Sequence, residues 1–178
     1  ATLPVLIVPY ATLLIPLYLL PNFARTVPVI DVIANMDLVW LALVLGMFQL
    51  PFATFMMRIS FESVPRELEE AALVDGSGSF GVFRHVLMPA VRPGIVTVGL
   101  FAFLAAWNDF LAPLILINSA SEQPLPLALV NLRQQTMGAV DFGSTEAGVV
   151  VMALPCLILF VLLQRYYVQG FMSGAVKG

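Results

Sequence analysis

Few side chains in this sequence could do covalent chemistry, and each of them lacks a partner at a useful spacing. Asp109 stands in an apolar stretch, and a lone carboxylate cannot form the proton-sharing pair of an aspartyl protease. His85 is the single histidine and has no acidic residue at ligand spacing, so we interpret it as a surface side chain. Cys156 is the single cysteine, which excludes an internal disulfide and favours an apolar packing role.

A phosphate-binding loop with the Gly-x-x-x-x-Gly-Lys-Ser/Thr pattern is absent from the sequence. Any nucleotide hydrolysis must therefore come from a partner. We expect no cofactor, no metal ion and no enzymatic activity in this chain.

Charged residues gather in residues 60–89, which we call the charged loop. Pro65 suits the first turn of a helix, where a missing N–H is harmless. Gly76 is predicted to take the left-handed conformation that ends this helix, and Pro89 is predicted to end the next one. Two short amphipathic helices on either side of a sharp bend favour a docking surface over a membrane span.

Within the charged loop, one set of residues keeps a characteristic spacing, namely Glu70, Ala71, Ala72, Asp75, Gly76, Leu87, Met88 and Pro89. In type and spacing these residues resemble the EAA loop of permease subunits from binding-protein-dependent ABC importers. Trp107, Asn108, Asp109 and Phe110, with the tail at residues 164–178, are similar to the carbohydrate-uptake, maltose-permease-like branch. The resemblance covers nearly the whole chain.

This resemblance implies that residues 1–178 are a permease domain that is incomplete at its N-terminus, with the charged loop as its cytoplasmic coupling loop. The chain would serve an ATP-driven sugar or oligosaccharide importer. Glu70 and the bend at Gly76 would enter a cleft of a separate ATP-binding subunit, whose dimer closes with ATP. Ala71, Ala72, Asp75 and Pro89 would complete the coupling site. The other implied partners are a second permease subunit, an extracytoplasmic solute-binding protein and membrane lipid, without nucleic acid.

Composition supports an integral membrane protein. The chain is 60% hydrophobic and only 11% charged, whereas soluble domains carry roughly a quarter charged residues. The mean hydropathy is +0.97. Continuous apolar runs favour helices over a barrel. We predict an all-α, polytopic transmembrane bundle with four spans at roughly residues 3–20, 38–57, 94–117 and 147–163.

The first span contains Pro4, Pro9 and Pro16, which predict an irregular helix. A wall of the translocation path and a kinked packing helix are equally open interpretations. Asn35 or Asp37 is predicted to cap the second span.

The charge distribution predicts the orientation. Four spans place both chain ends and the charged loop on one side, which carries Arg58, Arg66, Arg84, Arg92, Arg165 and Lys177. The opposite side carries Arg25 and Arg133. Because basic residues concentrate in cytoplasmic loops, this asymmetry predicts that the charged loop and the C-terminus are cytoplasmic. The resemblance implies that this multi-pass protein lies in the bacterial inner membrane.

Polar residues within the spans are candidates for the translocation path, namely Gln49, Trp107, Asn108 and Asp109. For Gln49, a hydrogen bond to a neighbouring helix is favoured over lining a path. Asp109 is expected in the outer part of the third span. There, structural bonding with Asn108 or with backbone is favoured over contact with substrate.

The connection at residues 118–143 is polar and is predicted to hold a short helix near residues 127–132. The resemblance would place this connection against the solute-binding protein, and a plain surface loop is an equally open interpretation. Ser144 or Thr145 is predicted to cap the last span.

Other function classes compete with the importer. The nearer alternative is an ABC importer of a non-sugar solute. A secondary transporter or channel that needs no ATPase would not require Glu70, Ala71 and Ala72 followed by Asp75 and Gly76. A membrane hydrolase using Asp109 would need a second catalytic group.

Overall fold

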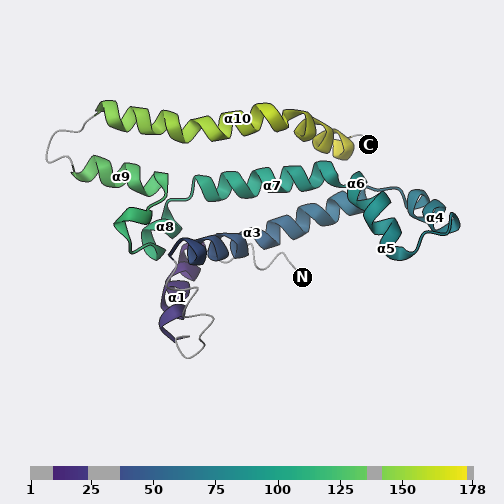
Figure 1. The fold of residues 1–178 in the computed structure, drawn as a ribbon, viewed down its shortest axis with the longest axis horizontal. Coiled ribbons are helices and arrows are strands. Elements are labelled where there is room, and N and C mark those ends of the chain that lie inside the picture. The colour runs from purple at the N-terminus through teal and green to yellow at the C-terminus, as the bar shows by residue number, and fades with distance from the viewer. Residues whose placement is uncertain (1–9, 24–36, 136–141, 176–178) are drawn as a thin grey trace. The chain divides into compact units, whose positions relative to one another are not determined.

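The computed structural model describes residues 10–23, 37–135 and 142–175, and every regular element in these ranges is a helix (Figure 1). This confirms the predicted all-α class. The helices are α1 (Tyr10–Phe23), α3 (Asp37–Glu62), α4 (Arg66–Val74), α5 (Ser79–Val82), η3 (Phe83–Leu87), α6 (Met88–Ala90), α7 (Arg92–Trp107), α8 (Leu111–Leu116), η4 (Ala120–Glu122), α9 (Leu125–Gln135) and α10 (Phe142–Ala175).

Two described helices are long and apolar enough to cross a membrane, and these are α3 and the Phe142–Gln164 part of α10. The helix over Ser79–Ala90 and α7 pass the same test together, but they bend by 64° at their junction. The apolar part of α1, Tyr10–Leu20, is shorter than a full span. The four-span count therefore stays a prediction, and residues 3–9 of the first predicted span lie outside the described residues.

The third predicted span is interrupted, so the expectation of one helix over residues 94–117 was wrong. α7 ends at Trp107 and α8 begins only at Leu111. Asn108 and Asp109 lie in the break, where their side chains bond to backbone groups. Pro113 has no N–H to offer the carbonyl four residues earlier, so a continuous α-helix would leave that acceptor without its usual donor.

Several helix boundaries differ from the predicted ones. Pro65 precedes α4 in an extended conformation instead of lying in its first turn. The helix after the bend passes through Pro89 and ends at Ala90, so Pro89 does not stop it. Ser144 and Thr145 lie inside the first turn of α10, whose bounds begin at Phe142, instead of capping it from outside.

Two of the remaining predictions on helices are confirmed, and one is not. The short helix near residues 127–132 is confirmed as α9. The second span is confirmed within α3, which continues through Pro51. α1 is helical through Pro16, so the expected irregularity does not appear there. Pro4, Pro9 and the cap at Asn35 lie outside the described residues.

The chain divides into two compact units. The first contains the described residues of Ala1–Pro51 and Leu104–Leu157. Its core consists of Leu14, Leu41, Val44, Ala112, Leu116 and Ile117, which come from α1, α3 and the region of α8. Tyr10, Trp40 and Phe48 pack against this core. Burial of these apolar side chains is what joins three separate segments into one unit.

The helix α10 differs from this core because none of the residues in its most apolar window is buried. Exposure of so much apolar surface to water is unfavourable. The exposed side chains of α10 therefore require lipid or a partner protein around them.

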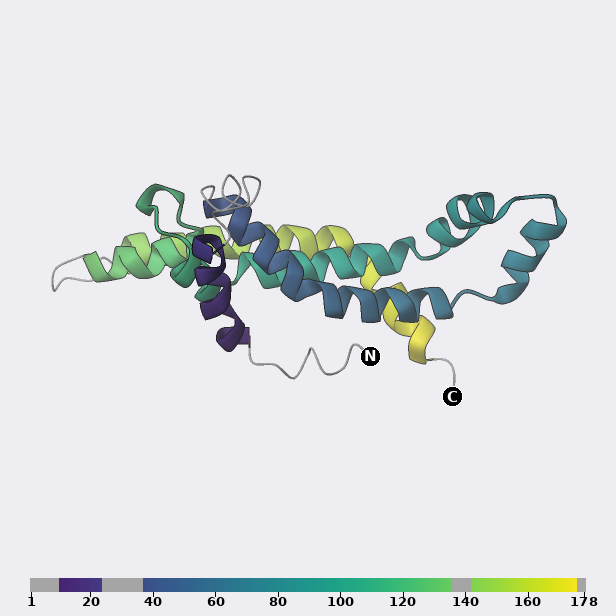
Figure 2. The same cartoon turned by 90° about the horizontal axis from the view of Figure 1, so that it is seen from below.

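The second compact unit contains the described residues of Phe52–Phe103 and Ile158–Gly178, and it includes the charged loop. α4 and the Ser79–Ala90 helix lie on the two sides of the bend and contact each other (Figure 2). Two aromatic pairs support this unit: Phe52 with Phe101 at 5.6 Å, and Phe61 with Phe83 at 6.5 Å between ring centroids. The loop is thus anchored to the helices on either side of it.

Candidate functional site

The bend of the charged loop is built by backbone hydrogen bonds. Gly76 has a φ of +85°, as its residue type predicted. Its N–H donates to the carbonyl of Leu73 at 3.1 Å, and the N–H of Ser77 donates to Ala72 at 3.0 Å. These two bonds form a Schellman motif, which ends α4 and reverses the chain. A side chain at Gly76 would be strained, because L residues rarely adopt this φ.

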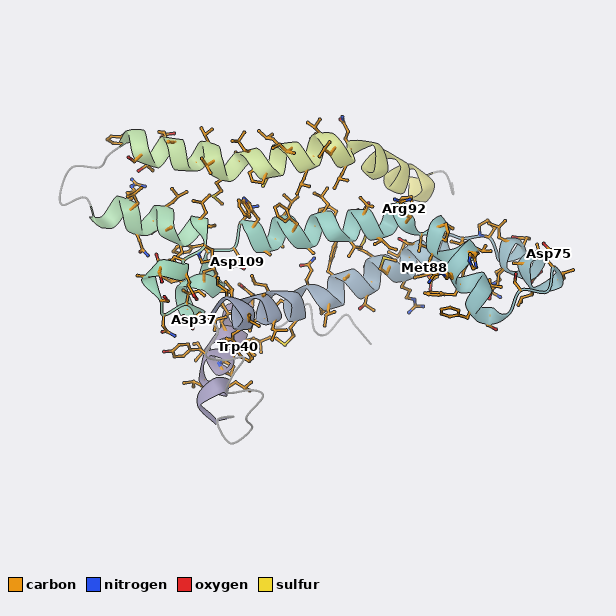
Figure 3. All side chains as sticks on the ribbon, in the orientation of Figure 1. Asp37, Trp40, Asp75, Met88, Arg92 and Asp109 are labelled. Atoms are coloured by element: carbon orange, nitrogen blue, oxygen red, sulfur yellow. The ribbon has the colours of Figure 1, made fainter. Side chains whose placement is uncertain are left out.

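Five of the six coupling residues suggested by the resemblance lie at or just before this bend, and the sixth, Pro89, lies in α6. Glu70 and Ala71 are exposed on α4, and Ala72 is buried beneath them. Asp75 is exposed at the bend itself (Figure 3). The space around Gly76 is open within this chain, since an added Cβ would meet no atom within 4 Å. The exposed surface is therefore available to a partner.

The helix after the bend contains a π-helical turn over Phe83–Leu87, in which the N–H of Met88 donates to the carbonyl of Phe83. Pro89 follows at once and has no N–H. A wide turn before a proline relieves the clash and the lost bond that a proline causes inside an α-helix. This arrangement explains why the helix passes through Pro89, and sequence reasoning missed it.

Apolar side chains are exposed beside the bend. Val74 is 87% exposed and Phe80 is 74% exposed, while Leu73 is exposed in the same stretch of α4. A group of exposed large apolar residues next to charged ones is typical of an interaction site. Phe83, further along the same helix, is 43% exposed.

A second candidate site is the break between α7 and α8. Trp107 donates its indole N–H to the carbonyl of Met152 on α10 at 2.9 Å. Asn108 donates its side-chain amide to the carbonyl of Leu104 at 2.8 Å, and the same carbonyl accepts the backbone N–H of Asn108 at 3.2 Å. These two side chains act in structural bonds at the break.

Asp109 begins α8. Its Oδ1 accepts the N–H of Ala112 at 2.9 Å, as a helix cap does, and its Oδ2 accepts the hydroxyl of Tyr10 at 2.5 Å. The expected hydrogen bond to backbone is present. The expected bond between Asp109 and Asn108 is not seen, because Asn108 bonds to Leu104. The bond from Tyr10 on α1 was not predicted from the sequence.

A further carboxylate holds the chain after α8. Asp37 was expected to cap its own helix, and its Oδ2 instead accepts the N–H groups of Asn118 and Ser119 at 3.0 and 3.2 Å. A partner 81 positions away leaves no local signal in the sequence.

The structure thus gathers the predicted residues into two groups. Of the residues predicted to couple to an ATPase, Glu70, Ala71, Ala72, Asp75 and Gly76 lie at or just before the bend, and Pro89 lies in α6. Trp107, Asn108 and Asp109 lie at the break between α7 and α8. Gln49 lies half-buried on α3. A translocation path lined by these four residues stays a prediction.

The chain is similar in sequence to several transport permease proteins. A permease protein of a diacetylchitobiose uptake system from Streptomyces coelicolor is 42% identical over 142 residues, which cover 80% of this chain and 51% of the relative. A trehalose transport system permease protein from Mycobacterium tuberculosis is 32% identical over 178 residues, which cover all of this chain and 62% of the relative. A sulfoquinovosyl glycerol transport system permease protein from Agrobacterium fabrum is 33% identical over 171 residues, covering 94% and 59%.

The chain therefore spans between half and two thirds of the length of these relatives. A family described as "Binding-protein-dependent transport system inner membrane component" has a sequence profile that matches residues 2–172 of this chain. The chain belongs to this family of inner-membrane transport permeases.

Proposed function

We propose that this chain is part of the transmembrane subunit of an ATP-driven importer for a sugar or oligosaccharide. The observation that carries the proposal is the bend of the charged loop, with Glu70, Val74 and Phe80 exposed around a left-handed Gly76. An anchored helix pair with an exposed apolar and acidic tip can transmit rigid-body motion to the helices attached to it.

The partner at this tip is proposed to be a separate ATP-binding subunit, acting as a dimer. Its closure with ATP would push the charged loop, and the attached helices would move between inward-facing and outward-facing states. A second permease subunit and an extracytoplasmic solute-binding protein would complete the importer. Family membership and the exposed tip support these partners.

The substrate is proposed to contain a sugar. The names of the relatives include diacetylchitobiose, trehalose and sulfoquinovosyl glycerol, each of which contains a sugar. A non-sugar solute is the alternative outcome of the transport test. A carrier without an ATPase and a membrane hydrolase are disfavoured, since neither requires the residues of the bend.

The proposed topology has four spans, with the charged loop and the C-terminus in the cytoplasm. The basic asymmetry of the sequence supports this orientation, although Arg25 and Lys177 lie outside the described residues.

The experiment uses the full-length permease, co-purified with its ATPase and second permease and reconstituted into liposomes with the solute-binding protein. Uptake of a panel of labelled mono- and oligosaccharides, amino acids and peptides is measured with and without ATP. The proposal expects ATP-dependent uptake of at least one sugar. Uptake that continues without ATP, or that is confined to non-sugar solutes, contradicts the mechanism or the substrate class respectively.

A further inference from the structure

The helix α8 is short and almost entirely apolar. It has six residues, and Ala112, Pro113 and Leu116 are buried. A helix of this length is not stable by itself in water, because nucleation is costly and too few bonds follow. Its position therefore depends on what holds its two ends.

Both ends are held by carboxylates that lie outside the helix. At the start, Asp109 accepts the N–H of Ala112 and the hydroxyl of Tyr10 on α1. Beyond the end, Asp37 on α3 accepts the N–H groups of Asn118 and Ser119. Figure 3 shows Asp109 where the ribbon passes from α7 to α8, and Asp37 at the start of α3. We call Tyr10, Asp37 and Asp109 the α8 clamp.

The clamp requires hydrogen-bond acceptors, and its geometry does not require charge. Both bonds to Asp37 fall on one oxygen, Oδ2, and the oxygen of an asparagine has two lone pairs to accept both. At Asp109, an asparagine oxygen could cap α8 while its amide donates to the Tyr10 oxygen. Alanine at either position would leave backbone N–H groups without these partners.

We propose that Asp37, Asp109 and Tyr10 are positioning residues that fix α8 to α1 and α3, so that these three elements move as one body during transport. This inference rests on the proposed importer function. When an acceptor is lost, α8 can shift relative to α1 and α3, and movement imposed on the helices no longer completes transport. ATP hydrolysis then continues with less solute carried.

The test measures the number of ATP molecules hydrolysed per solute transported by the reconstituted full complex. Asp37→Ala is expected to raise this ratio about fivefold, in line with the loss of a helix-end acceptor. Asp37→Asn is expected to stay within about twofold of the wild type because it keeps the acceptor. A structural defect alone would lower the amount of complex, and the ratio per assembled complex would stay unchanged.

Tyr10→Phe is the mildest variant, since it removes one hydroxyl and keeps the ring that contacts Phe48 edge-on at 4.7 Å. It is expected to raise the ratio about two- to threefold. In an Asp109→Ala background it should have no further effect, because the two groups act through one bond. Glu146→Ala is the control, as it removes an exposed carboxylate from the same compact unit.

The possible outcomes distinguish a failure of the clamp proposal from a failure of the proposed importer function. A wild-type complex without ATP-dependent uptake contradicts the proposed function. If the wild type transports and Asp37→Ala matches its ratio, or if Asp37→Asn is as defective as Asp37→Ala, the clamp proposal is wrong. If Asp37→Ala does not assemble, Tyr10→Phe decides, and a wild-type ratio in that variant contradicts the proposal.

Discussion

Gly94 on α7 lies directly against Ser60 on α3 in the second compact unit. A Cβ added at Gly94 would come within 2.8 Å of Ser60 Cβ and closer still to the Ser60 hydroxyl. That hydroxyl donates to the carbonyl of Met56 at 3.1 Å. The helices that flank the charged loop can approach this closely only because residue 94 has no side chain.

Gly94→Ala should therefore destabilise the permease by about 1–3 kcal/mol, the usual cost of overpacking. Thermal unfolding of the purified complex measures the effect. Gly99→Ala on the same helix is the control, because an added Cβ there meets nothing within 4 Å. Introducing Ser60→Gly should restore the stability of Gly94→Ala. A Gly94→Ala protein as stable as Gly99→Ala would show that the two helices do not pack this way.

Asp109→Asn should keep most transport activity. Asparagine caps helices as well as aspartate does, and its amide can donate to the Tyr10 hydroxyl oxygen. Asp109→Ala should lose about 1–3 kcal/mol of stability, because the cap is gone and the Tyr10 hydroxyl loses its acceptor. Uptake by the reconstituted complex and thermal unfolding check the pair. Loss of transport in a fully assembled Asp109→Asn complex would mean that the charge itself is required.

Phe80→Ser tests the exposed apolar surface at the bend. Because Phe80 is 74% exposed, its removal should change the stability of the permease by no more than about 0.5 kcal/mol. If Phe80 is buried against the ATPase, retention of the ATPase should fall about tenfold. Phe142→Ser is a matched control, since Phe142 is 69% exposed and lies outside the charged loop. Equal retention in both variants would exclude Phe80 from the docking surface.

The topology can be checked with reporter fusions. Fusions after Asn22, Ser77, Ser121 and Lys177 should report outside, inside, outside and inside, because the basic residues concentrate on the side of the charged loop. An inside signal from the fusion after Ser121, or an outside signal from that after Ser77, would contradict the orientation.

Local sequence rules predicted the parts of the fold that depend on local chemistry. The left-handed Gly76 follows from a glycine after an amphipathic run, and the long α3 follows from a continuous apolar stretch. The break after Trp107 carried a local signal as well, since Asn108 and Asp109 precede Pro113 in the manner of a helix start. The apolar composition of the surrounding stretch concealed that signal.

The parts that could not be predicted depend on distant residues. Tyr10 is 99 positions from Asp109, and Asp37 is 81 positions from Asn118. Asp37 bonds to backbone N–H groups and therefore imposes no residue type on its partner. The bond between the Tyr10 and Asp109 side chains joins segments whose separation follows no helical or strand period. The π-helical turn before Pro89 similarly depends on how the whole helix accommodates a proline.

The central claim is that the bend of the charged loop binds the ATPase and transmits its movement. Gly76→Val should weaken this binding, because a β-branched residue at a φ of +85° is strained by about 1–2 kcal/mol or more and places a side chain on the docking surface. Glu70→Lys should act similarly, since it reverses an exposed charge beside the bend. Gly78→Ala is the control, because Gly78 has a φ of −71° and open space around it.

The most direct measurement is the amount of ATPase that co-purifies with each full-length variant, followed by ATP-driven uptake in liposomes. The account predicts that Gly76→Val and Glu70→Lys insert into the membrane normally, retain less ATPase or transport less solute per ATP, and differ clearly from Gly78→Ala. Wild-type ATPase retention and wild-type transport in both variants would show that this bend is not the coupling element.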